Sequence, residues 1–153
     1  MLNFDFHNPT HIAFGQGRIA DLAKLVPAAA KVLILVGGAS AEKTGTLAEV
    51  RAALGERQHA TFSGIEPNPS YETSMKAVAQ IREGGFDFLL AVGGGSVIDA
   101  TKFIAAAVRF EGADPWAILE KHGRNIQGAM PFGSVLTLPA TGSEMNNGGV
   151  ITH

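Results

Sequence analysis

Apolar residues follow two alternating patterns along the chain. Some stretches are rich in apolar and β-branched residues, which is typical of strands covered on both faces of a sheet. These predicted strands cover residues 31–36, 58–62, 88–92 and 133–138. Other stretches place apolar residues at helical spacing. These predicted helices cover residues 17–26, 46–54, 70–84 and 97–109. Alternating strands and helices predict an α/β fold, a doubly wound and mostly parallel sheet.

Residues at the ends of these segments support the assignments. Ser70 is a candidate N-cap, and Gly55 and Gly84-Gly85 follow helices as stop signals. Asp114 and Pro115 predict a further short helix, with aspartate as N-cap and proline at the first helical position.

The two ends of the chain carry weaker patterns. Residues 3–14 are expected to form two short extended stretches, since Pro9 argues against a helix. Residues 150–152 have the composition of a new strand, so we expect the polypeptide to continue beyond them as a longer protein.

Composition narrows the class of protein. A chain of 153 residues fits one domain, and 46% apolar and 17% charged residues are typical of a globular protein. The net charge of −2 gives no reason to expect nucleic acid or an anionic membrane as partner. The chain has no cysteine, no apolar leader and no stretch long enough to span a bilayer. We therefore expect a cytoplasmic protein.

The segment AVGGGSVIDATK, residues 91–102, is the strongest candidate for chemistry. Three glycines after a strand allow close backbone approach and positive φ, and Ser96 and Asp99 can form a capping box. The free N–H groups of the following helix favour a phosphate. The segment is neither the G-x-G-x-x-G fingerprint nor a P-loop. Taken alone, it fits a tight strand-to-helix turn equally well.

Two other loops follow predicted strands. Gly37 to Ser40 lies where an adenosine ribose binds in nucleotide-binding sheets. The loop contains no acidic residue to bind the ribose 2′-hydroxyl of NAD, and the nearby Lys43 would attract the 2′-phosphate of NADP. We therefore expect a preference for NADP. The alternative is that this loop does not select between the two cofactors. The loop TLPATGSEMNN, residues 137–147, offers hydroxyls for a diphosphate or nicotinamide, but such loops are commonly structural. Asn68, between two prolines, offers a polar group or simply a turn.

No catalytic or metal-binding set is visible in the sequence. His7 and His11 have the spacing of a helical metal pair, but Pro9 between them argues against a shared helix face. H-E-x-x-H and Asp-x-x-x-His motifs are absent. The residues alone thus predict a site for a phosphate-bearing ligand and no catalytic residues.

The loops together resemble the iron-containing alcohol dehydrogenase family, in its NADPH-dependent butanol dehydrogenase and aldehyde reductase branch. The likeness runs along the whole chain. Its stretches are NFDFHNPTHIAFGQGRI at 3–19, GIEPNPSYET at 64–73, FLLAVGGGSVIDATKFIAAA at 88–107, DPWAIL at 114–119 and VLTLPATGSE at 135–144. The combination is specific to the family, although no single stretch would be.

The resemblance implies a Rossmann-like dinucleotide-binding domain over residues 1–153 of an enzyme with two domains. It implies that a helical domain, absent from this chain, holds Fe²⁺ or Zn²⁺ through one aspartate and three histidines. It also implies NADP as cofactor, with NAD possible. The implied cofactor-binding residues are Gly37, Gly38, Ser40, Asn68, Gly94, Gly95, Ser96, Thr137, Thr141, Ser143 and Asn146. Ala39 stands where near relatives commonly have a third glycine, which narrows the space beside the ribose.

The implied chemistry is hydride transfer between nicotinamide and a primary alcohol or aldehyde, with the metal as Lewis acid. We expect negligible dehydrogenase activity from this chain alone, since no metal ligand is implied within it. The family commonly forms dimers, so a homodimer is expected. We also expect apolar surface that a missing domain would cover. The alternatives are a nucleotide-binding module without chemistry and a truncation product without a role of its own.

Overall fold

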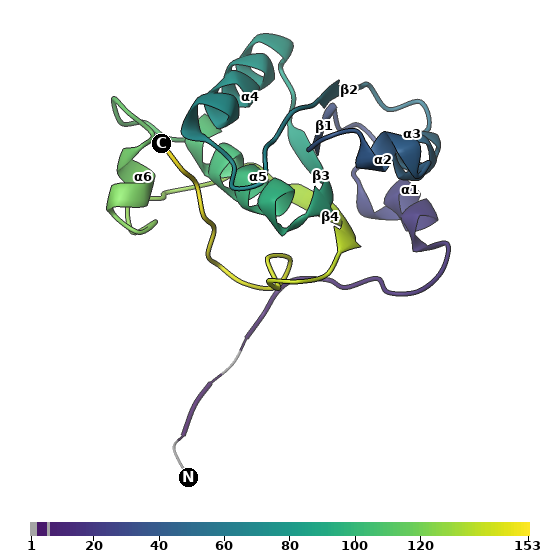
Figure 1. The fold of residues 1–153 in the computed structure, drawn as a ribbon, viewed down its shortest axis with the longest axis horizontal. Coiled ribbons are helices and arrows are strands. Elements are labelled where there is room, and N and C mark those ends of the chain that lie inside the picture. Colours follow the sequence, from purple (N-terminus) through teal and green to yellow (C-terminus); the bar gives the residue numbers. More distant parts are fainter. Residues whose placement is uncertain (1–2, 6) are drawn as a thin grey trace.

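The computed structural model describes residues 3–5 and 7–153, and its centre is a parallel four-stranded sheet (Figure 1). The strands are β1 (Val32–Val36), β2 (His59–Phe62), β3 (Phe88–Gly94) and β4 (Phe132–Leu138). Their order across the sheet is β2-β1-β3-β4. All three strand pairings are parallel, as the alternation of strands and helices predicts.

Helices connect the strands on both sides of the sheet. They are the 3₁₀ helix η1 (Arg18–Asp21), α1 (Leu22–Leu25), α2 (Ser40–Lys43), α3 (Thr46–Leu54), α4 (Tyr71–Gly84), α5 (Gly95–Val108) and α6 (Ala117–Glu120). The predicted helix over residues 17–26 is therefore a 3₁₀ turn followed by one α-helical turn. The short helix α2 has no counterpart in the prediction. The prediction of residues 46–54 matches α3.

Two apolar cores lie on opposite faces of the sheet. On one face, Leu33 and Leu89 pack with Ile81 of α4 and with Ile98 and Ile104 of α5. On the other face, residues of β1 and β3 pack with the helices near the amino terminus; the residues are Leu22, Val32, Ile34, Val50, Leu54 and Leu90. Figure 1 shows the corresponding separation, with α4 and α5 on one side of the strands and α1 to α3 on the other. This two-sided cover explains why β1 is fully buried.

The strand order reverses between β1 and β3. From β1 the chain runs outward to β2, and from β3 it runs outward in the opposite direction to β4. The register pairs Val36 with Val92, so the two strands end side by side. A reversal of this kind opens a crevice at the carboxyl ends of the strands, where open α/β sheets bind ligands.

Most of the predicted helix ends are confirmed. Ser70 is the N-cap of α4, and its hydroxyl accepts a hydrogen bond from the Thr73 N–H at 3.2 Å. Gly85 ends the same helix in the left-handed conformation, with φ of 63°. The Asp114 carboxylate accepts from the Trp116 N–H, but α6 begins only at Ala117, two residues later than Pro115 suggests.

Two other expectations are corrected. β4 is a strand, but among the described residues it forms an edge of the sheet, and none of its residues is buried. Residues 3–5 and 7–14 contain neither a helix nor a paired strand, so the extended stretches expected there are not part of the sheet. At the other end, residues 150–152 contribute a single parallel bridge, between Thr152 and Ser70, in place of a full strand.

Within the described residues, every helix is too short or too polar to cross a membrane.

Candidate dinucleotide-binding site

The site is built where three neighbouring strands end. β1 runs into Gly37 to Ser40, β3 runs into Gly93 to Ser96, and β4 leads into the loop over residues 139–149. Since Gly94 pairs with Leu138 in the register of β3 and β4, the second and third loops also begin side by side. The three loops predicted from the sequence thus lie together at the carboxyl ends of β1, β3 and β4.

The amino-terminal end of α5 is open. The helix begins at Gly95, and its N-cap, Gly94, supplies no side chain to accept from the first-turn N–H groups. Helix N–H groups without side-chain acceptors, at the positive end of the helix dipole, favour an anion. The predicted capping box of Ser96 and Asp99 is wrong, because Ser96 lies inside the helix. The Asp99 carboxylate accepts instead from the Val150 N–H at 3.1 Å.

Close packing explains two of the three glycines after β3. A Cβ atom on Gly93 would lie 2.7 Å from Val97 Cγ2. A Cβ atom on Gly95 would lie 2.6 Å from Thr141 Oγ1 and 3.1 Å from Ser143 Oγ. None of the three glycines has a positive φ, so that part of the prediction is wrong. The glycines serve here for close approach, and at Gly95 the approach is to the loop that follows β4.

The Thr141 and Ser143 hydroxyls form a pair beside Gly95. The two oxygens lie 2.8 Å apart, and Ser143 is 2% exposed. Gly142 between them has a φ of 68°, a left-handed conformation that favours glycine. Two predicted binding residues are therefore grouped at the start of α5, next to its open N–H groups.

The loop after β1 is more exposed. A Cβ atom on Gly37 would lie 3.1 Å from the Ile65 carbonyl oxygen, whereas one on Gly38 would meet nothing within 4 Å. Ser40 is the exposed first residue of α2, and Lys43 is its last residue. This loop leaves open space at Gly38 beside the end of β1.

The remaining predicted residues lie farther from this group. Asn68 is exposed and has a left-handed φ of 56°; its carbonyl accepts from the Thr152 hydroxyl. Within the described residues, no hydrogen bond joins the Asn68 side chain to the glycine loops. Thr137 is exposed on the edge strand β4. Asn146 uses its side chain to organise its own loop, since it donates to the Thr141 carbonyl and accepts from Gly148 N–H.

One residue of the motif was not assigned a role from the sequence. Lys102 extends from α5 and donates hydrogen bonds to Asn146 Oδ1 at 2.8 Å and to the Gly148 carbonyl at 2.7 Å. Its spacing of three residues from Asp99 on a helix was the available signal, because such residues share a face.

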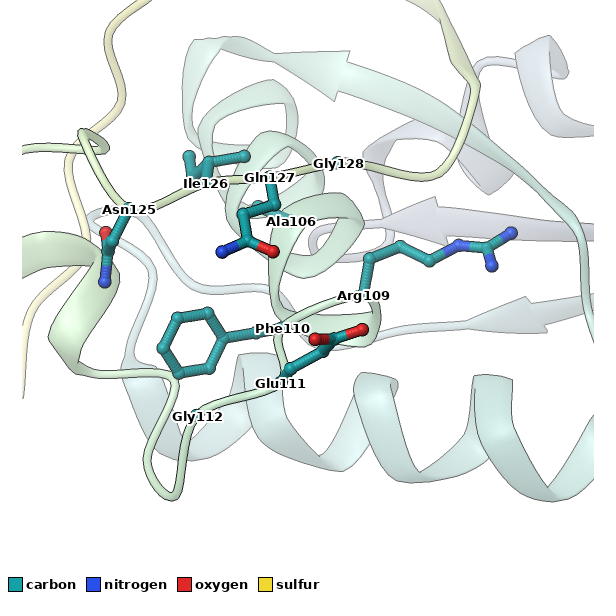
Figure 2. Close-up of a pocket in the computed structure, with 9 residues that line it drawn as sticks. All are labelled: Ala106, Arg109, Phe110, Glu111, Gly112, Asn125, Ile126, Gln127 and Gly128. Carbon is teal, nitrogen blue, oxygen red and sulfur yellow. The ribbon is translucent and has the colours of Figure 1, made fainter.

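Two cavities lie away from the glycine loops. One, of about 410 Å³, lies between residues 7–10 and residues 145–147. The other, of about 320 Å³, lies at the carboxyl end of α5, between Arg109 and the loop over residues 125–128 (Figure 2). The glycine loops line neither of these cavities, whereas Asn146, one of the predicted binding residues, lines the first.

The described residues do not fit a divalent metal. Among residues 3–5 and 7–153, no three histidine, cysteine, aspartate or glutamate side chains are grouped as metal ligands. His153 instead pairs with Glu72, with 2.8 Å between Nδ1 and Oε1. No chemical step of this chain can therefore be derived through a metal.

Comparison with known proteins decides the family. The family model described as iron-containing alcohol dehydrogenase matches residues 9–153. The chain belongs to the iron-containing alcohol dehydrogenase family. The resemblance inferred from the sequence is thereby confirmed, and family members are dehydrogenases acting on alcohols.

Curated relatives extend well beyond this chain. The NADPH-dependent aldehyde reductase YqhD of Escherichia coli is 56% identical over the whole chain, which spans 40% of its length. A probable NADH-dependent butanol dehydrogenase of Bacillus subtilis is 47% identical, again over the whole chain and 40% of its own length. The chain thus spans about two fifths of the relatives it matches.

Solved structures of family members share the fold. The crystal structure of Escherichia coli YqhD matches with a TM-score of 0.95, covering 98% of this chain and 39% of its own. NADH-dependent butanol dehydrogenase A of Thermotoga maritima matches with a TM-score of 0.90 at 39% identity, covering 98% of this chain and 38% of its own. The Rossmann-like α/β fold predicted from the sequence is therefore confirmed.

Proposed function

We propose that this chain is the dinucleotide-binding domain, over residues 1–153, of an NADP(H)-dependent alcohol dehydrogenase or aldehyde reductase. The observation that carries the proposal is the open amino-terminal end of α5 at the reversal of strand order. That position combines helix N–H groups that lack a side-chain cap with the carboxyl ends of the strands, where open α/β sheets bind ligands. Family membership supplies the nature of the nucleotide.

Each of the three loops binds a different part of the cofactor. The α5 N–H groups, with Gly94, Gly95 and Ser96, hold the diphosphate. Gly37, Gly38 and Ser40 lie at the adenosine ribose, and Asn68 contributes beside them. Thr137, Thr141, Ser143 and Asn146 hold the part of the cofactor that crosses toward β4.

When bound, the nicotinamide supplies hydride chemistry between its ring and an alcohol or aldehyde carbon. The contribution of this chain is binding and orientation. The buried Ser143 hydroxyl and its partner Thr141 give two hydrogen-bonding groups of fixed position beside the diphosphate. Fixed groups of this kind place the cofactor without reorganising during the reaction.

We infer a preference for NADP over NAD. The loop from Gly37 to Ser40 has no carboxylate to hydrogen-bond a ribose 2′-hydroxyl or to repel a 2′-phosphate. Lys43, three residues further on, adds positive charge. Relatives use both cofactors, since the Escherichia coli reductase is named for NADPH and the Bacillus subtilis protein for NADH.

The rest of the catalytic machinery is proposed to lie outside this chain. We propose that Fe²⁺ or Zn²⁺ and the alcohol or aldehyde are held by the part of the relatives that this chain does not span. We further propose a cytoplasmic homodimer with no nucleic acid or membrane partner. A nucleotide-binding module without chemistry is the second candidate, favoured by the lack of a metal-ligand cluster among the described residues.

NADPH titration tests the proposal, with Ser96→Asp as the informative variant. A carboxylate in the first turn of α5 interacts favourably with the helix dipole, so the fold is retained. The same carboxylate repels the diphosphate, so we expect the dissociation constant for NADPH to rise at least about tenfold. Isothermal titration or NADPH fluorescence measures the change.

Gln127→Glu is the matched control for this experiment. It adds the same charge at an exposed position by the far end of α5 (Figure 2). It should bind NADPH as the unchanged chain does. An unchanged chain that binds no NADPH at millimolar concentration, or a Ser96→Asp variant that binds normally, would overturn the proposed site.

A further inference from the structure

Lys102 holds a loop against α5 through an ammonium group whose hydrogen bonds are used within the protein. It lies seven residues after Gly95, about two helical turns, and its side chain is 18% exposed. Its Nζ donates to Asn146 Oδ1 at 2.8 Å and to the Gly148 carbonyl at 2.7 Å. Asp99 Oδ1 lies 3.9 Å away on the same helix face. Two of the three ammonium hydrogens are thus engaged by protein oxygens, and the Asp99 carboxylate adds a longer ionic contact.

Asp99 fixes the same segment one turn nearer to the site. Its Oδ2 accepts from the Val150 N–H at 3.1 Å, across 51 residues of sequence. A Cβ atom on Gly149 would lie 3.6 Å from Asp99 Cβ, so the Gly149 backbone packs directly on the helix. Residues 146–150 therefore run along α5, held at both ends by Lys102 and Asp99.

Asn146 connects this arrangement to the candidate cofactor site. Its Oδ1 accepts from Lys102 and from the Gly148 N–H, and its Nδ2 donates to the Thr141 carbonyl at 3.4 Å. The Thr141 hydroxyl in turn contacts Ser143 beside Gly95. A continuous path of contacts joins the Lys102 ammonium to the two hydroxyls at the start of α5.

We propose that Lys102 is a positioning residue for the dinucleotide, acting through Asn146 to hold the Thr141 and Ser143 hydroxyls beside the first turn of α5. This inference rests on the proposed function, since it names the residue that shapes the same site. Lys102 does not touch the cofactor in this arrangement. A charged donor is suited to the role because hydrogen bonds from an ammonium group to carbonyl oxygens are stronger than those between neutral groups.

The surroundings of Lys102 are consistent with an internal role. Partial burial lowers the pKa of Lys102 from its ordinary value, while the negative charges of Asp99 and Glu144 oppose that shift. Two of the three donors of Lys102 are engaged by Asn146 and Gly148, which fits a role within the protein.

The test compares Lys102→Met with Lys76→Met in the 153-residue chain. Methionine keeps most of the apolar stem and removes the ammonium, and Lys76 is an exposed lysine on α4 that serves as the matched control. Amide hydrogen exchange measures the local stability of the loop directly, and it requires no ligand. In Lys102→Met we expect faster exchange of amides in residues 141–150, with the amides of β1 and β3 unchanged. Lys76→Met should exchange as the unchanged chain does.

Measurements of nucleotide binding test whether loosening the loop weakens the affinity for the cofactor. Losing charge-assisted hydrogen bonds that hold the hydroxyls should raise the NADPH dissociation constant about tenfold in Lys102→Met. Binding of 2′-AMP, which is confined to the adenosine half at the β1 loop, should stay within about twofold. A general loss of structure would weaken both ligands equally, so the split between them separates positioning from misfolding.

The exchange and binding results test the positioning role of Lys102 and the proposed function separately. Unchanged exchange in residues 141–150 overturns the positioning role, whatever happens to binding. Weaker NADPH binding without faster exchange also overturns it, in favour of direct contact between Lys102 and a phosphate. If the unchanged chain binds no NADPH but Lys102→Met still loosens the loop, the proposed function fails while Lys102 remains the residue that holds the loop.

Discussion

At the scale of single residues, Tyr71 is set in the most perturbed environment among the described titratable groups. Its ring packs edge-on against Phe103 and Trp116, with centroid distances of 5.8 and 5.4 Å. Its hydroxyl donates a short hydrogen bond to Asp114 Oδ1. Burial, followed by this hydrogen bond and the negative charge of Asp114, raises the pKa of Tyr71 to about 12. Tyr71 thereby connects α4 to the segment before α6.

Titration of Tyr71 follows from this environment. The pKa in the folded chain exceeds the ordinary value of 10.0, so the contribution to the free energy of unfolding is complete below pH 10. It is lost as the pH rises toward 12. Tyr71 is the only tyrosine, so phenolate absorbance reports it without interference. The folded chain should titrate near pH 12 and the urea-unfolded chain near 10. A midpoint near 10 in the folded chain would contradict this environment.

At the scale of secondary-structure elements, Arg57 joins two segments that lie far apart in sequence, the end of α1 and the end of α3. It follows α3, and its guanidinium donates to the Leu54 carbonyl at the end of that helix. It also donates to the carbonyls of Ala23, Val26 and Pro27, around the end of α1. The Leu54 and Pro27 carbonyls also accept backbone N–H groups, from Arg57 and Ala30. The arginine therefore adds hydrogen bonds to helix-end and turn carbonyls where α1 meets α3.

Replacement of Arg57 tests its importance to stability. Arg57→Met removes the four hydrogen bonds and keeps part of the apolar stem, so we expect the free energy of unfolding to fall by about 2–3 kcal/mol. Urea unfolding followed by circular dichroism measures the change. Arg124→Met, at an exposed arginine, should alter stability by no more than about 0.5 kcal/mol. Equal stability of the two variants would show that the Arg57 contacts are not formed in solution.

At the scale of the whole molecule, the sheet and its loops are those of a family dehydrogenase, but the described residues hold no metal-ligand cluster. Large apolar side chains are also exposed, including Phe4, Phe14, Leu138 and Val150. Such exposure was expected from the sequence. Both features fit a chain that spans two fifths of the relatives it matches.

The lack of a metal-ligand cluster among the described residues leads to a prediction about the enzymatic activity of the isolated chain. We expect it to bind NADPH but to show no measurable reduction of a short aliphatic aldehyde. A Lewis acid contributes several kcal/mol of charge stabilisation to such a reaction, and residues 3–5 and 7–153 offer no cluster of ligands for one. NADPH absorbance, followed with and without added Zn²⁺ or Fe²⁺, measures the rate. The matching control is the Escherichia coli reductase. Turnover by the isolated chain would contradict the proposal that the metal and the substrate are held outside it.

The sequence alone was sufficient for those features that depend on neighbouring residues. Helical spacing, the Ser70 cap and the Gly85 stop involve residues within a few positions of one another, so the pattern that predicts them is complete in a short window. The apolar run of β1 likewise indicated a strand covered on both faces. The glycine and hydroxyl loops were recognised because their residue types are sufficient to suggest a phosphate site.

Tertiary structure decided what depends on distant neighbours. Asp99 contacts Val150 across 51 residues and Lys102 contacts Asn146 across 44, so neither partner is visible in a local window. The same holds for Gly95, whose need to be glycine comes from Thr141. β4 was mistaken for a buried strand because its composition does not show that it lies at the edge of the sheet formed by the described residues. Local pattern thus set the elements and the chemistry of the loops, while the packing of the chain on itself set which groups meet.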